Sequence, residues 1–163
     1  MLSGLLVVLH VVAVFWLVAG IIGRLTCYRQ AARADDLVKI RTFSELGGLF
    51  ELSMVRPATF AVLITGLLAA WLRGWPILGF LQGGSVNWVL AALVTYLSIV
   101  PVIVFILFPR SRVYRAALEE ATVAGQITPR LRAALHDPLV AAARGYEIAM
   151  TLTLLYLMVL KPF

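Results

Sequence analysis

Charged residues are scarce in this sequence, and so are cysteine and histidine. Only 13% of its 163 residues are Asp, Glu, Lys or Arg, whereas 62% are hydrophobic; soluble domains contain about 25% charged residues. This balance excludes an ordinary soluble domain. The single cysteine, Cys27, excludes an intramolecular disulfide, and the two histidines do not complete a zinc-binding pattern around it.

Several motifs of catalysis and transport are also missing. The sequence has no glycine-rich phosphate loop and no series of acidic residues within its apolar runs, as an ion-translocating path would need. A paired-histidine haem site would need a second histidine in an apolar run, and none is present. The net charge of +6 comes from basic residues clustered in two connectors, which is a pattern of membrane topology and predicts no nucleic-acid partner.

Long apolar runs dominate instead. About 20 helical residues, at 1.5 Å each, cross the roughly 30 Å of a bilayer's hydrocarbon. We therefore expect an all-α protein, an antiparallel bundle of four transmembrane helices in a single membrane domain over residues 1–163. The first run has no basic region before it and is too long for a signal-peptide core, so we expect it to be a membrane span. The expected spans cover about residues 2–23, 53–73, 87–108 and 139–160.

The charge distribution predicts the orientation of the bundle. The connectors 24–52 and 109–138 each contain five Lys or Arg residues, whereas the connector 74–86 contains none. Basic connectors stay on the cytoplasmic side of a membrane. We therefore expect a multi-pass protein of the bacterial inner membrane, with both basic connectors and short surface helices on the cytoplasmic side and with the N- and C-termini outside.

Capping signals predict where helices begin and end. The sequence from Thr42 to Glu45 has the pattern of a capping box, so the second helix is expected to begin near residue 43. Such a helix would be longer than a bilayer requires, and we expect a bend at Gly47-Gly48 or near Pro57, or an interfacial first segment. In the third connector we expect two short helices, one over 111–123 that ends at Gly125 and one that starts at Thr128-Pro129, before a last helix that starts at Asp137-Pro138.

His10 is the one ionisable side chain in the first span. Counted at 1.5 Å per residue, it lies at about the depth of Thr65, Tyr96 and the neighbouring threonines of the other spans. The simplest interpretation is a neutral imidazole that joins helices by a hydrogen bond. The functional interpretation is a cofactor site of His10, Thr65 and Tyr96, with haem ligation or proton transfer at His10.

Arg56 and Glu147 are charged residues in or beside other spans. Both are expected nearer the cytoplasmic side than His10, at similar depth, so we expect a structural ion pair between them. An arginine that extends to the lipid headgroups is the alternative for Arg56. No metal site is expected apart from a haem iron at His10.

Four patterns in the sequence carry a family resemblance: His10-x-x-Ala13-x-x-Trp16-x-x-x-Gly20, Arg56-Pro57, Gly125-x-Ile-Thr-Pro129 and Leu160-Lys-Pro-Phe163. Together they resemble the bacterial "predicted integral membrane protein" family, a four-helix domain of unknown function. The first pattern and the Lys-Pro-Phe end are more remotely similar to the HemJ type of protoporphyrinogen oxidase and to the copper-resistance D membrane domain. The HemJ resemblance implies haem binding at His10. The HemJ type also has a membrane lysine, and no expected span of this chain contains one.

Two functions are compatible with these features. The first is a non-catalytic accessory subunit that packs in the lipid bilayer against other subunits of a larger bacterial complex, respiratory or photosynthetic. The second is a haem-binding redox or porphyrin-handling membrane protein with His10 as axial ligand.

Overall fold

The computed structural model of the chain describes residues 2–85 and 87–162, and these residues form helices joined by short turns. Phe163, the last residue of the Lys-Pro-Phe pattern, lies outside them. Seven segments are α-helices, and three short segments, labelled η, are π- or 3₁₀-helical. In chain order they are α1 (Leu2–Arg33), α2 (Leu37–Phe50), η1 (Glu51–Val55), α3 (Arg56–Leu72), η2 (Gly79–Gln82), α4 (Trp88–Val102), η3 (Ile103–Leu107), α5 (Phe108–Ala124), α6 (Pro129–Leu135) and α7 (Pro138–Leu160).

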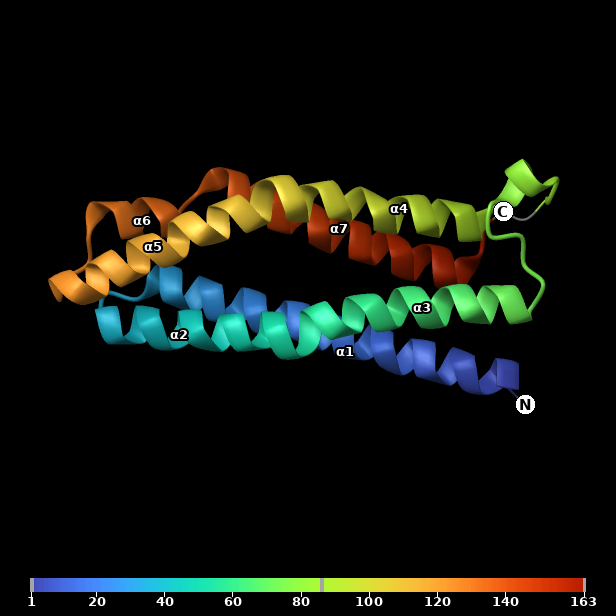
Figure 1. Cartoon of the computed structure of the whole chain (residues 1–163), viewed down its shortest axis with the longest axis horizontal. Coiled ribbons are helices and arrows are strands. Elements are labelled where there is room, and N and C mark those ends of the chain that lie inside the picture. The colour runs from blue at the N-terminus through green and yellow to red at the C-terminus, as the bar shows by residue number, and fades with distance from the viewer. Residues whose placement is uncertain (1, 86, 163) are drawn as a thin grey trace.

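The helices lie in two layers along one long axis (Figure 1). One layer contains α1, α2 and α3, and the other contains α4, α5, α6 and α7. The start of α1 and the end of α7 lie at the same end of the molecule. Within the described residues, four helical stretches are long and apolar enough to cross a membrane. The expected all-α, antiparallel four-span architecture is therefore confirmed.

The four stretches extend well beyond the predicted spans. They cover Gly4–Arg33, Leu37–Leu72, Trp88–Ala124 and Pro129–Leu160. At 1.5 Å per residue, the 36 and 37 residues of the two longest correspond to about 55 Å of helix, against about 30 Å of hydrocarbon. Most of the two basic connectors is thus helical, and residues 111–123 continue the third stretch as part of α5 instead of forming a separate short helix.

The predicted start of the second helix near residue 43 is wrong. The helix begins at Leu37, because the Asp36 side chain accepts a hydrogen bond from the backbone N–H of Val38 at 3.0 Å. Thr42, expected as the cap, lies inside α2 and donates to the carbonyl of Val38. Glu45 pairs with Arg41 one turn earlier, at 2.8 Å. An Asp at the N-cap satisfies a free N–H group of the first turn, so the helix starts at the earlier signal.

A bend was expected at Gly47-Gly48 or near Pro57; Gly47 and Gly48 lie inside α2, and a π-helical turn precedes Pro57. This turn is η1, which ends two residues before Pro57, and η3 likewise ends two residues before Pro109. A proline has no N–H to donate to the preceding turn, so the hydrogen-bond pattern must change there. The other capping predictions are confirmed: Thr128 accepts from Leu131 N, Asp137 accepts from Leu139 N, and Gly125 ends α5 with a φ of 65°.

The two layers are held together at the end where α2, α5 and α6 meet. A cluster of four fully buried side chains lies there, Ile40, Ala117, Ala121 and Leu131. At the opposite end, Trp75 and Trp88 pack edge to face with ring centres 5.0 Å apart, and the Lys161 ammonium lies 4.9 Å from the Trp75 ring. The packed cluster therefore lies in the basic part of the chain, outside the predicted spans.

Candidate functional site

His10 lies between the two layers, in contact with α3 and α7. Its Nδ1 is 3.0 Å from Thr65 Oγ1, and its Nε2 is 3.4 Å from the sulfur of Met158. The Thr65 hydroxyl also donates to the carbonyl of Ala61. Gly66 makes this approach possible, since a Cβ there would lie 2.9 Å from the imidazole Cε1.

Of the predicted cofactor-site residues, the structure brings Thr65 to His10 and directs Tyr96 elsewhere. The Tyr96 hydroxyl donates to the carbonyl of Thr59 at 3.0 Å. Met158, which does contact His10, has no distinguishing signal in the sequence, because it is one apolar residue within an apolar run.

Haem does not fit the surroundings of His10. Histidine and methionine are an axial pair found in cytochromes, but Nε2 of His10 and the sulfur of Met158 are in direct contact, which leaves no room for an iron and its porphyrin between them. Nδ1 is engaged by Thr65. Among the residues described, no group of three His, Cys, Asp or Glu side chains is arranged to hold a metal ion.

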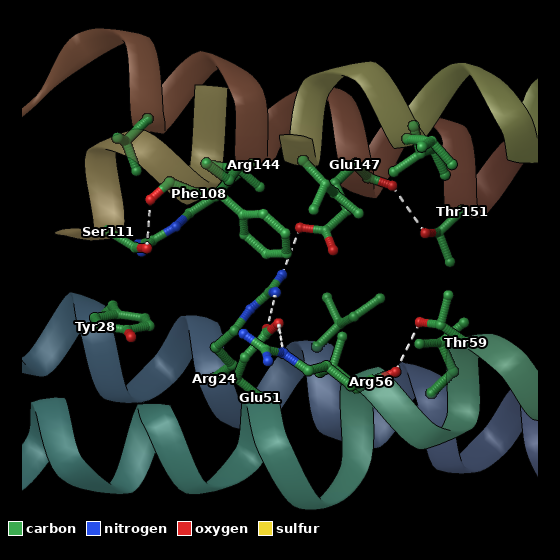
Figure 2. A pocket seen from close by; sticks show the side chains of 18 of the residues that line it. Arg24, Tyr28, Glu51, Arg56, Thr59, Phe108, Ser111, Arg144, Glu147 and Thr151 are labelled. Carbon is green, nitrogen blue, oxygen red and sulfur yellow. Dashed lines mark hydrogen bonds and ion pairs between the residues drawn. The ribbon is translucent and has the colours of Figure 1, made fainter. Parts of the chain in front are cut away.

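A second group of polar side chains is centred on Arg24, farther along α1 than His10 and nearer the basic connectors (Figure 2). The Arg24 guanidinium donates from Nη1 to Glu51 at 2.6 Å and from Nη2 to Glu147. Glu51 also accepts from Nε of Arg56 at 3.2 Å. Arg24 and Glu147 are only 7% and 5% exposed. We call these four residues, from α1, η1, α3 and α7, the ion-pair network.

The network differs from the direct pair between Arg56 and Glu147 predicted above. Glu147 is paired with Arg24, and Arg56 reaches the network only through Glu51. Arg56 is largely exposed, with 46% of its side chain accessible, which leaves Arg24 as the cation buried beside Glu147.

A signal for Arg24 was present in the sequence. The packing face of the first helix contains His10, Ala13, Leu17 and Gly20, and the same helical spacing continues to Arg24 and Cys27. Residue 24 was expected in a connector, so it was not counted on this face. The structure shows that α1 continues without a break to Arg33.

More aromatic and basic side chains border the network. The Arg144 guanidinium lies 4.3 Å from the centre of the Tyr28 ring, and Tyr28 packs edge to face on Tyr114 at 6.0 Å. The Tyr114 hydroxyl is hydrogen-bonded to Ser44 of α2. These contacts connect the two layers beside a cavity of about 460 Å³, which the network also lines.

The chain was compared with known families, curated proteins and solved structures. No curated protein and no solved structure matches it. The remote similarity to the HemJ type and to the copper-resistance D domain therefore stays a prediction. A family model, described as Predicted integral membrane protein (DUF2269), matches residues 4–162. Because the match covers nearly the whole chain, the protein belongs to this family of integral membrane proteins.

Proposed function

We propose that the protein is a non-catalytic subunit of a larger complex in the bacterial inner membrane, such as a respiratory or photosynthetic one. In this proposal the two layers lie in the bilayer with both termini outside, and the end formed by α2, α5, α6 and the last part of α1 contacts partners in the cytoplasm. We call this end the basic cap.

The observation that carries the proposal is the length of the helices relative to a bilayer. Helical stretches of 36 and 37 residues exceed the hydrocarbon thickness by about 25 Å, so the basic cap extends into water. The cap has a packed core of its own, with Ile40 and Leu131 fully buried. A rigid projection of this kind provides a surface on which a soluble domain or subunit can dock.

The charges of the basic cap support the same proposal. Five exposed basic residues of the cap take part in none of the ion pairs found among the described residues. Such a surface attracts acidic partners and remains on the cytoplasmic side of the membrane. The five residues are Arg29, Arg33, Lys39, Arg112 and Arg115.

The ion-pair network supports a non-catalytic role. A general acid or base must be free to exchange a proton with a substrate. Glu51 and Glu147 are instead both paired with Arg24, and the neighbouring Tyr114 hydroxyl is bonded to Ser44. These two carboxylates and this hydroxyl are therefore committed to contacts within the chain.

Native sizing tests the proposal. The tagged chain would be extracted from its own membranes in a mild detergent, and we expect it to migrate in an assembly larger than a dimer of itself. The triple variant Arg29→Gln/Arg33→Gln/Lys39→Gln should leave the assembly, whereas Lys161→Gln, at the opposite end, should remain in it. A monomer or homodimer of the unmodified chain would contradict the proposal.

The alternative function is a haem-binding redox or porphyrin-handling protein with His10 as axial ligand. The inward position of His10, between α3 and α7, favours it. The absence of space between these two side chains weighs against it, and we therefore prefer the subunit. An absorption spectrum of the purified protein distinguishes the two.

A further inference from the structure

The cavity between the two layers is large and mostly apolar. Its volume of about 460 Å³ lies within the range of about 300–1,000 Å³ that is typical of ligand sites. Side chains from both layers line it, among them Leu17, Val55, Ile99, Ile103 and Leu155. All five belong to the apolar runs, so this part of the cavity lies at the depth of the lipid chains.

One end of the cavity is polar and carries excess positive charge. In the ion-pair network, two arginines balance two glutamates. Arg144 lines the same cavity (Figure 2) and is stacked on Tyr28, but it is part of no ion pair among the described residues. A guanidinium that is partly removed from water needs an anion to offset its lost hydration.

Arg24 lines the same polar end of the cavity, with its terminal nitrogens already paired. Both of its terminal nitrogens are bonded to glutamates, whereas its Nε is buried and has no hydrogen-bond acceptor. Buried N–H groups nearly always have a partner in folded proteins. Arg24 lines the cavity, but this nitrogen is enclosed by protein atoms, so a ligand in the cavity would contact Arg144 and not this N–H.

The depth of Arg24 in the membrane indicates that the anion is a lipid headgroup. Arg24 directly follows the apolar run that ends at Gly23, so it lies near the boundary between lipid chains and headgroups on the side of the basic cap. Basic pockets between membrane helices on the cytoplasmic side bind anionic lipid headgroups. An acyl chain matches the apolar remainder of the cavity.

We propose that this cavity binds one anionic phospholipid from the leaflet on the side of the basic cap. The phosphate accepts hydrogen bonds from Arg144, at the end of the cavity that Arg24 also lines, and an acyl chain lies between the two layers. A neutral quinone would fill the apolar part but would leave Arg144 without a counter-charge. This inference is independent of the subunit proposal, because the lipid site lies within a single chain.

Native mass spectrometry of the full chain tests the proposal. Protein stripped of lipid in detergent would be titrated with phosphatidylglycerol and with phosphatidylcholine that carry the same acyl chains. We expect one phosphatidylglycerol to bind at least about fivefold more tightly, the effect of one arginine near an anionic lipid. Equal affinities would overturn the proposal. Displacement of the lipid by millimolar inorganic phosphate, or its replacement by a neutral quinone, would also overturn it.

Variants locate the site. Arg144→Gln should remove most of the preference for phosphatidylglycerol, and Arg144→Lys, which keeps the charge, should retain it. Arg33→Gln is the matched control, because Arg33 is exposed and does not line the cavity. Ile99→Trp, which fills the apolar part, should weaken binding of both lipids. Unchanged preference in a folded Arg144→Gln protein would refute the site, and if that variant loses helical content, Arg144→Lys and Ile99→Trp carry the test.

Discussion

Arg24 and Glu147 form an ion pair between the first and the last helix of the chain, 123 positions apart in sequence. Both side chains are almost fully buried. The pair joins the two layers beside the cavity. The stability of the bundle should therefore depend strongly on this pair.

Removing the cation of the network should be costly. Arg24→Gln leaves the buried Glu147 without a partner and Glu51 with Arg56 alone, and we expect a loss of about 3–5 kcal/mol in the free energy of unfolding. Adding Glu147→Gln should recover part of this loss, because one of the two carboxylates is then neutral. Unfolding in mixed detergent micelles measures both effects.

The matched control is Arg41→Gln. Arg41 pairs with Glu45 one helical turn away, and both side chains are more than half exposed, so its loss should cost less than about 1 kcal/mol. Similar losses for Arg24→Gln and Arg41→Gln would show that burial does not govern the contribution of the network.

A close helix contact at Gly20 makes a second prediction. A Cβ at Gly20 would lie 2.8 Å from Met54 Cβ and 3.2 Å from the backbone nitrogen of Val55. Gly20→Ala must therefore push α1 away from η1, and we expect it to destabilise the protein by about 1–3 kcal/mol. Thermal unfolding in detergent measures the change.

Gly145→Ala provides the comparison for Gly20→Ala. Gly145 lies within α7, and a Cβ there would meet nothing within 4 Å. Alanine loses less backbone entropy than glycine in a helix, so this variant should be stabilised by roughly 0.5–1 kcal/mol. Opposite signs for the two substitutions are expected, and the same sign would disprove the close contact at Gly20.

The start of α2 makes a third prediction. Asp36→Ala removes the observed cap and should cost about 0.5–2 kcal/mol. Thr42→Ala, at the position where the capping box was expected, should change stability by less than about 0.5 kcal/mol, because Thr42 lies exposed within the helix. Chemical unfolding of the two variants side by side would decide which residue caps the helix, and a larger effect at Thr42 would restore the capping box.

The contact between His10 and Met158 makes a fourth prediction. The purified protein should be colourless, with no Soret band, because the two side chains leave no space for a haem. A Soret band that disappears in His10→Ala would establish the haem alternative. His10→Asn is the control, since an amide can still bond to Thr65 while no longer providing an imidazole ligand.

The capping residues show how far local signals extend. Thr128, Asp137 and Gly125 were identified as helix ends from their own side chains or backbone preference, and the structure places them there. The capping box at Thr42 was wrong because Asp36, six residues earlier, already provides a cap. Local chemistry predicts which residues can cap a helix. Where two such signals follow one another, the helix starts at the first and continues through the second.

The candidate sites were less accessible to such reasoning. Counting 1.5 Å per residue along each span correctly placed His10 beside Thr65. The same count also placed Tyr96 beside His10, whereas the Tyr96 hydroxyl is bonded to Thr59. It paired Glu147 with Arg56, whereas Arg24 is the actual partner. Depth along a helix follows from residue count, but the rotation of each helix about its axis decides which side chains at one level meet.

The sequence by itself determined the helical class, the four apolar helical stretches, the charge difference between the two ends and the helix ends at Gly125, Thr128 and Asp137. These properties depend on apolar run length and on contacts between residues a few positions apart. Only the tertiary structure decided that Arg24 lies between Glu51 and Glu147, that Met158 covers His10 and that the two layers enclose a cavity. Each of these depends on how helices distant in sequence rotate and shift against one another, which no local pattern encodes.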